Sequence, residues 1–336
     1  MDDVFIELSI QFLLSAAGIV VAGVFLAQSA DQIAERTGLG RLFTGSILLA
    51  GATSLPELLV DISAIRKEMP DLAVGDLLGS SLMNLLILAV ADLIHRKPAK
   101  IFSRAAAHHA LSAAVSINVT AIACIAIFLG PNLAGISAGE IGLGPLSIGL
   151  FYLLALRLVY RSQPQARHAP ELKAASGRQE IVRPFSVFFG AALAIFVAAP
   201  FLAAAAGGLA ERTGLGTTFL GSTLVAFCTS LPEVVSTFAA VRMGAFDLAV
   251  GNIFGSNSFN MILLIPLDLV HEGNLLGAVS RTHVLTGLSV ILATSVAVMG
   301  QLYDAEKRKK FVEPDAFGVI GIVIASLIIL FWILPG

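Results

Sequence analysis

The sequence predicts an all-α integral membrane protein with ten transmembrane helices arranged as two inverted five-helix repeats. Three observations support this fold class: a strongly apolar composition, ten apolar segments of membrane-spanning length, and an internal duplication. Of the 336 residues, 57% are hydrophobic and 13% are charged, and the mean hydropathy is +0.88. Soluble globular proteins usually carry about 25% charged residues, so the composition indicates that a lipid bilayer surrounds the chain.

The polar features outside the apolar segments are few. The formal net charge of −2 gives no indication of a nucleic-acid partner. The acidic N-terminus MDDVFIELS lacks the basic start of a cleavable signal peptide, so we expect the first apolar segment to be retained. Cys124 and Cys228 lie in different apolar segments without a spacing motif, and we expect both to be small buried side chains.

The apolar segments set the domain organisation. A helix needs about 20 apolar residues to cross a hydrocarbon core about 30 Å thick. We therefore divide the chain into a first five-helix repeat (1–160), a polar linker (161–184) and a second five-helix repeat (185–336). The ten windows lie near 6–28, 43–65, 72–94, 107–129, 140–160, 185–209, 218–241, 248–270, 283–302 and 315–334.

The two halves are copies of each other. Aligned without a gap, residues 35–95 and 211–271 share 30 identities in 61 positions, which indicates an internal duplication. Because five spans is an odd number, the second copy must start from the opposite side of the membrane, as in transporters built from inverted repeats. The motifs ERTGLG (35–40, 211–216), TSLPE (53–57, 229–233) and DLAVG (71–75, 247–251) recur at an offset of 176 residues.

Basic residues predict the orientation. With the N-terminus outside, 17 of the 21 Lys and Arg residues fall in loops on the inner side and 4 fall outside. Positive charge accumulates on the cytoplasmic side of membrane proteins. We therefore expect both termini outside and the 161–184 linker in the cytoplasm, in the inner or plasma membrane of the cell.

The second and seventh windows contain the most costly residues of the sequence, Glu57 and Glu233. A carboxylate near the bilayer centre costs at least a few kcal/mol, and no Lys or Arg lies at a matching depth. Each glutamate follows a proline, Pro56 or Pro232, which cannot donate a helical hydrogen bond and frees carbonyls near one turn earlier. Bent helices that present carbonyls, hydroxyls and a carboxylate are typical ligands of hard cations. The alternative is that each glutamate has a structural role, either protonated or paired with a basic residue.

The third and eighth windows supply polar partners for these glutamates. GDLLGSSLMN (75–84) matches GNIFGSNSFN (251–260). Ser80 and Asn84 lie four residues apart, as do Ser256 and Asn260, so each pair shares one helix face. The glycines at positions 75, 79, 251 and 255 follow a small-xxx-small pattern that lets helices approach closely.

With these motifs in view, the sequence resembles the calcium/cation antiporter superfamily in its sodium/calcium exchanger branch. GATSLPELL with DLAVGDLLGSSLMN, and FCTSLPEVV with DLAVGNIFGSN, resemble the two alpha repeats of that family, within 45–84 and 221–260. The resemblance implies a secondary transporter without a cofactor that exchanges Ca²⁺ for Na⁺ by alternating access, with ions bound near the midplane. The proton-coupled branch typically has a GNAxE-type motif, which neither copy contains. Neither the oligomeric state nor the stoichiometry follows from these patterns.

The resemblance also implies a ligand set. Glu57 and Glu233 correspond to the central carboxylates shared by Ca²⁺ and Na⁺. The carbonyl, hydroxyl and amide ligands implied for the first copy are Ala50, Thr53, Ser54, Ser80 and Asn84, and those implied for the second are Ala226, Thr229, Ser230, Ser256 and Asn260.

The sequence departs from the family pattern at the polar positions near this site. An aspartate is frequent at the position of Asn260, whereas Asp61 stands where a small hydroxyl is usual and Asp76 replaces an asparagine. If Asp61 turns inward, it adds a third carboxylate to Glu57 and Glu233, and repulsion among them favours a bound proton. If Asp61 faces a vestibule, it attracts cations. These departures leave an H⁺-coupled antiporter of Ca²⁺ or another cation as the alternative function.

Two other classes are disfavoured by the sequence. The AVGD segment at 73–76 is loosely similar to an aspartyl-protease motif, but residue 73 is Ala rather than Gly and no second matching Asp motif follows. The sequence has no HExxH motif. A channel is the remaining alternative, and single-channel currents would reveal it.

Overall fold

The computed structural model describes residues 3–95, 109–133, 137–138, 140–162, 178–213, 227–302 and 314–333, and these residues are almost entirely helical. The strands β1 (Ser137–Ala138) and β2 (Ile141–Gly142) form one short antiparallel hairpin. Within the described ranges, seven helices are long and apolar enough to cross a membrane. They are α1 (Asp3–Thr37), α5 (Pro70–Ile94), α6 (Ala110–Leu133), α7 (Leu143–Ser162), α9 (Arg178–Arg212), α12 (Phe246–Val270) and α14 (His283–Leu302).

The remaining elements are shorter helices. A broken segment consists of α2 (Arg41–Thr44), the π-helix η1 (Gly45–Leu49), α3 (Ala50–Thr53) and α4 (Leu55–Arg66). Its second-copy counterpart α11 (Leu231–Arg242) is followed later in the chain by α13 (Leu275–Ala278) and α15 (Pro314–Ile333). The expected all-α membrane fold is confirmed in this coarse form, and Ala226 lies outside the described residues.

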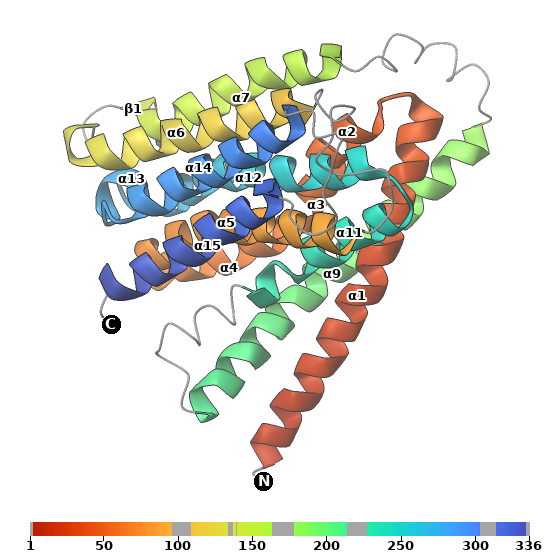
Figure 1. Cartoon of the computed structure of the whole chain (residues 1–336). Coiled ribbons are helices and arrows are strands. Elements are labelled where there is room, and N and C mark those ends of the chain that lie inside the picture. The colour runs from red at the N-terminus through yellow and green to blue at the C-terminus, as the bar shows by residue number, and fades with distance from the viewer. Residues whose placement is uncertain are drawn as a thin grey trace.

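The helices α1 and α9 are longer than the apolar windows predicted. Each has 35 residues. Both helices continue beyond the apolar window into charged sequence, α1 as far as Thr37 and α9 as far as Arg212. Helix α9 begins at Arg178, so the last part of the expected 161–184 linker is helical. Figure 1 shows α1 and α9 running side by side at one side of the helical bundle.

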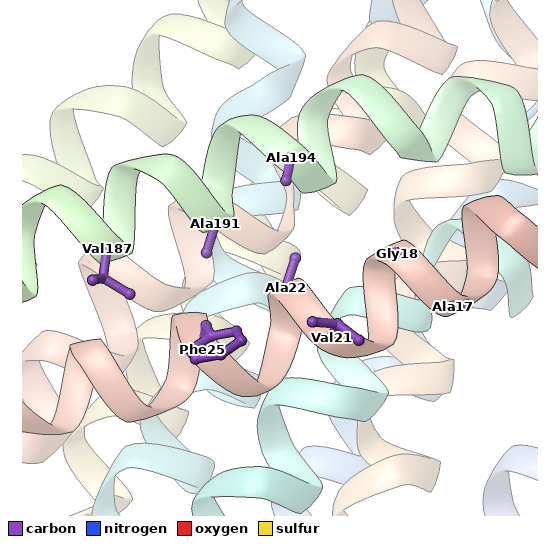
Figure 2. Close-up of a pocket in the computed structure, with 8 residues that line it drawn as sticks. All are labelled: Ala17, Gly18, Val21, Ala22, Phe25, Val187, Ala191 and Ala194. Atoms are coloured by element: carbon purple, nitrogen blue, oxygen red, sulfur yellow. The ribbon is translucent and has the colours of Figure 1, made fainter.

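A groove between α1 and α9 opens on this side of the molecule (Figure 2). It has a volume of about 560 Å³. The side chains that line it are all apolar, so the groove offers no ligand oxygen for a cation. They are Ala17, Gly18, Val21, Ala22, Phe25, Val187, Ala191 and Ala194.

The second window is a broken helix, as the proline pattern predicted. The segment bends by 41° between Thr53 and Leu55, at Ser54, whose φ is −88° and ψ is 0°. Pro56 has no N–H to donate to the preceding turn. In the second copy α11 also begins directly after a serine, Ser230, with φ −80° and ψ 4°. The serines of the two TSLPE motifs therefore have nearly the same backbone conformation.

Glycines let the broken segment lie directly against α12. A Cβ atom built on Gly251 would lie 2.6 Å from the Leu42 carbonyl oxygen, and one on Gly255 would lie 2.5 Å from Ser46 Cα. Any larger residue would force these backbones apart. The close approach predicted from the small-xxx-small pattern is confirmed for this pair of glycines.

The glycines of the first copy have looser surroundings. A Cβ atom on Gly75 would meet the flexible side chain of His283 at 3.2 Å, and no described atom lies within 4 Å of a Cβ on Gly79. The first-copy glycines therefore show no close helix contact of this kind within the described part of the chain.

Two histidine–aspartate pairs join the halves of the chain. His109 Nε2 lies 2.9 Å from Asp247 Oδ1 and ties the start of α6 to the start of α12. His283 Nε2 lies 2.9 Å from Asp71 Oδ1 and ties the start of α14 to the start of α5. Asp71 and Asp247 occupy the same position in the two DLAVG motifs, so each copy is held to the other by an equivalent contact.

Replacement of Gly255 by alanine tests the close contact between η1 and α12. We expect Gly255→Ala to lower the free energy of unfolding by about 1–3 kcal/mol, the usual cost of overpacking. A thiol-reactive fluorescent dye can report the thermal transition, because Cys124 and Cys228 are free and buried, as predicted. Gly190→Ala is the matched control, since Gly190 has no neighbour within 4 Å and alanine favours helix. Equal melting temperatures for the two variants would contradict the close contact.

Candidate cation site

Two glutamates lie at the first turns of α4 and α11. Glu57 and Glu233 are each 1% exposed, and their carboxyl groups are close enough to repel each other. Each leaves its Oε2 atom without a hydrogen-bond partner. No Lys or Arg is among the buried side chains of the described residues, so a bound ion or a proton must balance this charge.

Hydroxyl groups of the first copy lie beside the glutamate of the second. Glu233 of the second copy faces Thr53 and Ser54 of the first copy. Thr53 Oγ1 of the first copy lies 3.4 Å from Ser256 Oγ of the second. The TSLPE segment of the first copy therefore contacts α12 of the second copy.

The reciprocal contact completes the crosswise arrangement. Ser230 Oγ of the second copy donates to Ser80 Oγ of the first at 3.4 Å. Thr229 is buried beside Ser230. In the first copy the carbonyl oxygen of Ala50 accepts from Thr53 Oγ1 at 3.2 Å. All of the residues named from the sequence except Ala226 lie within the described part of the chain, and Thr53 and Ser54 are the neutral groups that contact Glu233.

The two asparagines expected at the site use their nitrogen atoms for packing. Asn84 Nδ2 donates to Asn257 Oδ1 at 3.0 Å, and Asn260 Nδ2 donates to the Leu77 carbonyl at 3.2 Å. The Oδ1 atoms of Asn84 and Asn260 are buried without a partner. Each amide therefore keeps an acceptor oxygen available for a cation, because its donor end is already engaged.

Asn257 is a positioning residue that the sequence reasoning missed. Besides accepting from Asn84, it donates from Nδ2 to the Ser81 carbonyl oxygen at 3.1 Å. Its side chain thus bridges α12 to α5 and fixes the orientation of the Asn84 amide. Its place in the GSN triplet, directly after Ser256, was the signal that could have identified it.

The chemistry of the centre follows from its unpartnered atoms. Buried acceptor oxygens without donors are rare in proteins unless a ligand supplies the missing interaction. Those named here are Glu57 Oε2, Glu233 Oε2, Ser54 Oγ, Asn84 Oδ1 and Asn260 Oδ1. Within the described ranges, no three His, Cys, Asp or Glu side chains are grouped so that they could hold one metal ion. The centre is a set of oxygens with two carboxylates, which suits a hard cation.

Asp61 lies one helical turn beyond Glu57 on α4. It is 0% exposed, and its carboxylate lies near that of Asp76 on α5. Both Asp61 oxygens lack a hydrogen-bond partner. Asp61 also lies close enough to Glu57 for their carboxylates to repel each other, so it adjoins the central pair as well as Asp76.

Fold and site together define a class of protein: a helical membrane protein in which a broken helix, α2–α4, and the start of α11 each carry a buried glutamate. The sequence profile of the sodium/calcium exchanger protein family matches residues 8–160 and 184–334. The chain belongs to the sodium/calcium exchanger protein family, which places it among transporters rather than enzymes.

Individual relatives and solved structures agree with this assignment. The inner membrane protein YrbG of Escherichia coli (strain K12) is 30% identical over 267 residues, which cover 76% of this chain and 79% of that protein. The sodium/calcium exchanger MaX1 of Methanosarcina acetivorans is 26% identical over 290 residues, covering 78% and 83%. The sodium-calcium exchanger NCX_Mj, soaked with 2.5 mM Na⁺ and 10 mM Sr²⁺, has the same fold with a TM-score of 0.71 at 18% identity, covering 98% of this chain and 99% of that one.

Replacement of Asn257 by alanine tests its positioning role. We expect Asn257→Ala to lower the free energy of unfolding by about 1–3 kcal/mol, because the Ser81 carbonyl and the Asn84 amide both lose a buried partner. Thermal unfolding followed by thiol reactivity measures the change. The control is Ser258→Ala, since Ser258 only donates to Phe254 within its own helix. A melting temperature of Asn257→Ala equal to that of the control would exclude a bridge between the helices.

Proposed function

We propose that the protein is a secondary active antiporter that exchanges Ca²⁺ for Na⁺ across the membrane by alternating access. The observation that carries the proposal is the pair of buried glutamates, Glu57 and Glu233, which share one oxygen-lined centre and have no buried Lys or Arg to balance them among the described residues. Membership of the sodium/calcium exchanger family supports it, as do the names of relatives such as MaX1 and the putative antiporter CaxA of Alkalimonas amylolytica.

In this mechanism the two carboxylates provide the charge that Ca²⁺ and Na⁺ compete for. An empty site would carry two unbalanced charges inside an apolar bundle, which is costly, so the change of access needs a loaded site. Because Ca²⁺ and Na⁺ compete for the same two carboxylates, one ion must leave before the other can bind. The protein therefore exchanges the two ions and does not let either pass alone. The neutral ligands that we propose beside Glu57 and Glu233 are Ala50, Thr53, Ser54, Ser80 and Asn84 in the first copy, and Ala226, Thr229, Ser230, Ser256 and Asn260 in the second.

The proposal includes ten transmembrane helices in two inverted repeats. The seven long apolar helices are supplemented by the broken segment α2–α4, by α11 with the sequence before it, and by α15. The equal 25-residue helices α5 and α12 at an offset of 176 residues support the duplication. We place both termini outside and the linker in the cytoplasm, and we infer the inner or plasma membrane as the location.

H⁺-coupled exchange is the second candidate, and a specific observation favours it. The position at which exchangers of this family often have an aspartate is Asn260, whose amide donates to Leu77 O and to Ser81 Oγ. The centre therefore has one carboxylate fewer than the family pattern implies, while Asp61 and Asp76 add carboxylates nearby. With one carboxylate fewer at the position of Asn260 and two more at Asp61 and Asp76, a different set of cations, including protons, would balance the charge of the site.

Transport in proteoliposomes separates the two candidates. Vesicles loaded with Na⁺ and diluted into Na⁺-free buffer are expected to take up ⁴⁵Ca²⁺, whereas K⁺-loaded and acid-loaded vesicles are not. Glu57→Gln and Glu233→Gln should each lower the uptake rate at least about 100-fold, since each removes a full ligand charge from a buried site. Ser9→Ala, a surface change in α1, is the control. Uptake driven by acid loading alone would favour H⁺ coupling, and uptake by the Gln variants at the wild-type rate would refute the glutamate site.

The orientation can be tested with reporter fusions. Alkaline phosphatase is active only outside the cytoplasm, and green fluorescent protein exported in unfolded form does not fluoresce. We expect phosphatase activity for a fusion after Gly336 and fluorescence for green fluorescent protein inserted within residues 161–184. The reverse result for either fusion would show that the positive-inside assignment is wrong for that half of the chain.

A further inference from the structure

The two copies differ at one pair of facing positions beside the glutamates. In the second copy, Asn252 on α12 donates from Nδ2 to Thr237 Oγ1 at 3.1 Å and to Ser236 Oγ at 3.0 Å on α11. These contacts form a neutral bridge one helical turn beyond Glu233. The residues 176 positions earlier are Asp61, equivalent to Thr237, and Asp76, equivalent to Asn252.

The first copy therefore places two carboxylates where the second has a hydroxyl and an amide. Asp61 is 0% exposed and neither of its oxygens has a hydrogen-bond partner. Asp76 is partly exposed, and its Oδ2 atom is buried without a partner. The Asp61 and Asp76 carboxylates lie close enough to repel each other. Asp76 also repels Glu57 and Glu233, so the pair directly adjoins the central glutamates. Helix α4 packs against α5 here without any donor that could satisfy Asp61 among the described residues.

We propose that Asp61 and Asp76 form a second cation site, which holds a divalent cation such as Ca²⁺ between the central glutamates and the membrane face where α5 begins. Two carboxylates match the charge of a divalent ion. Oxygen ligands suit Ca²⁺, which takes six to eight of them. Because Asp76 is partly exposed, water molecules can complete the coordination shell. The buried, unpartnered Asp61 oxygens supply the inner part of it.

The position of this site gives it a role in ion access. Asp71 at the start of α5 is exposed, with 56% of its side-chain surface accessible. Asp76 follows about one turn further along α5, and on α4 Asp61 lies between Glu57 and the helix end at Arg66, so these carboxylates lie between this membrane face and the central glutamates. On the opposite side, Asp247 leads only to the neutral Asn252–Thr237 bridge. A cation arriving at the α5 face is therefore held on its way to the centre, whereas one arriving at the other face is not.

The proposal rests on the proposed function only for the identity of the ion, since the argument for a bound cation comes from the unpartnered oxygens of Asp61 and Asp76 themselves. A proton shared by Asp61 and Asp76 is the competing explanation. It would balance one charge and leave the other buried.

The experiment measures equilibrium ⁴⁵Ca²⁺ binding to the purified full chain in detergent at neutral pH. In the background Glu57→Gln/Glu233→Gln, which disables the central site, we expect one Ca²⁺ to remain bound per chain. Addition of Asp61→Thr and Asp76→Asn should weaken this binding at least about 100-fold, because both ligand charges are removed. The residues introduced are those that the second copy carries at the same positions, so they fit the fold.

The outcomes separate this proposal from the central one. Equal Ca²⁺ binding by the double and quadruple variants, or no binding by a folded double variant, would overturn the Asp61–Asp76 site, and the second result would favour a shared proton. Thermal unfolding by thiol reactivity establishes that each variant is folded. Unchanged exchange by Glu57→Gln/Glu233→Gln in proteoliposomes would overturn the central site instead, whatever the binding result at Asp61 and Asp76.

Discussion

The burial of two like-charged carboxylates in an apolar bundle is the constraint on which the rest of this structure depends. Glu57 and Glu233 are each 1% exposed, and isolated buried charges cost far more than a folded protein can spare. Thr53 and Ser54, at the bend of the broken helix, hydrogen-bond Glu233 and so reduce that cost. In the proposed mechanism a bound cation offsets most of the rest.

Each copy of the repeat is incomplete without the other. Thr53 meets Ser256, and Ser230 meets Ser80, so each TSLPE segment finds its partner serine on a helix of the opposite copy. The glycines at 251 and 255 allow this contact, since any Cβ there would push α12 away from the broken segment. The crosswise contacts therefore place the two TSLPE segments against each other's copy rather than against their own.

The sequence predicted the elements whose cause is local and periodic. Apolar windows located α5 and α12 to within two residues, and Pro56 predicted the break because its missing N–H acts on its own helix. Contacts between distant segments were beyond this reasoning. Asn257 reaches Ser81 across 176 residues, and His109 reaches Asp247 across 138, so neither pairing follows from spacing. The direction of Asp61 was likewise undecided, because its helix position fits both an inward and an outward turn.

The two copies share a backbone conformation at equivalent positions but differ in the charge of their side chains. At the turn after the broken helix, Glu68 has a φ of 58° and Gly244, 176 positions later, a φ of 76°, so the left-handed turn persists although a glycine holds it more easily. Beside the glutamates the reverse has happened: equivalent positions carry Asp61 and Asp76 in one copy and Thr237 and Asn252 in the other. In the proposed alternating-access mechanism, backbone symmetry gives two similar end states, because either copy can take the role of its counterpart. The unequal charge would then make the two faces bind ions differently, and a difference in binding between states is what lets an ion shift the equilibrium between them.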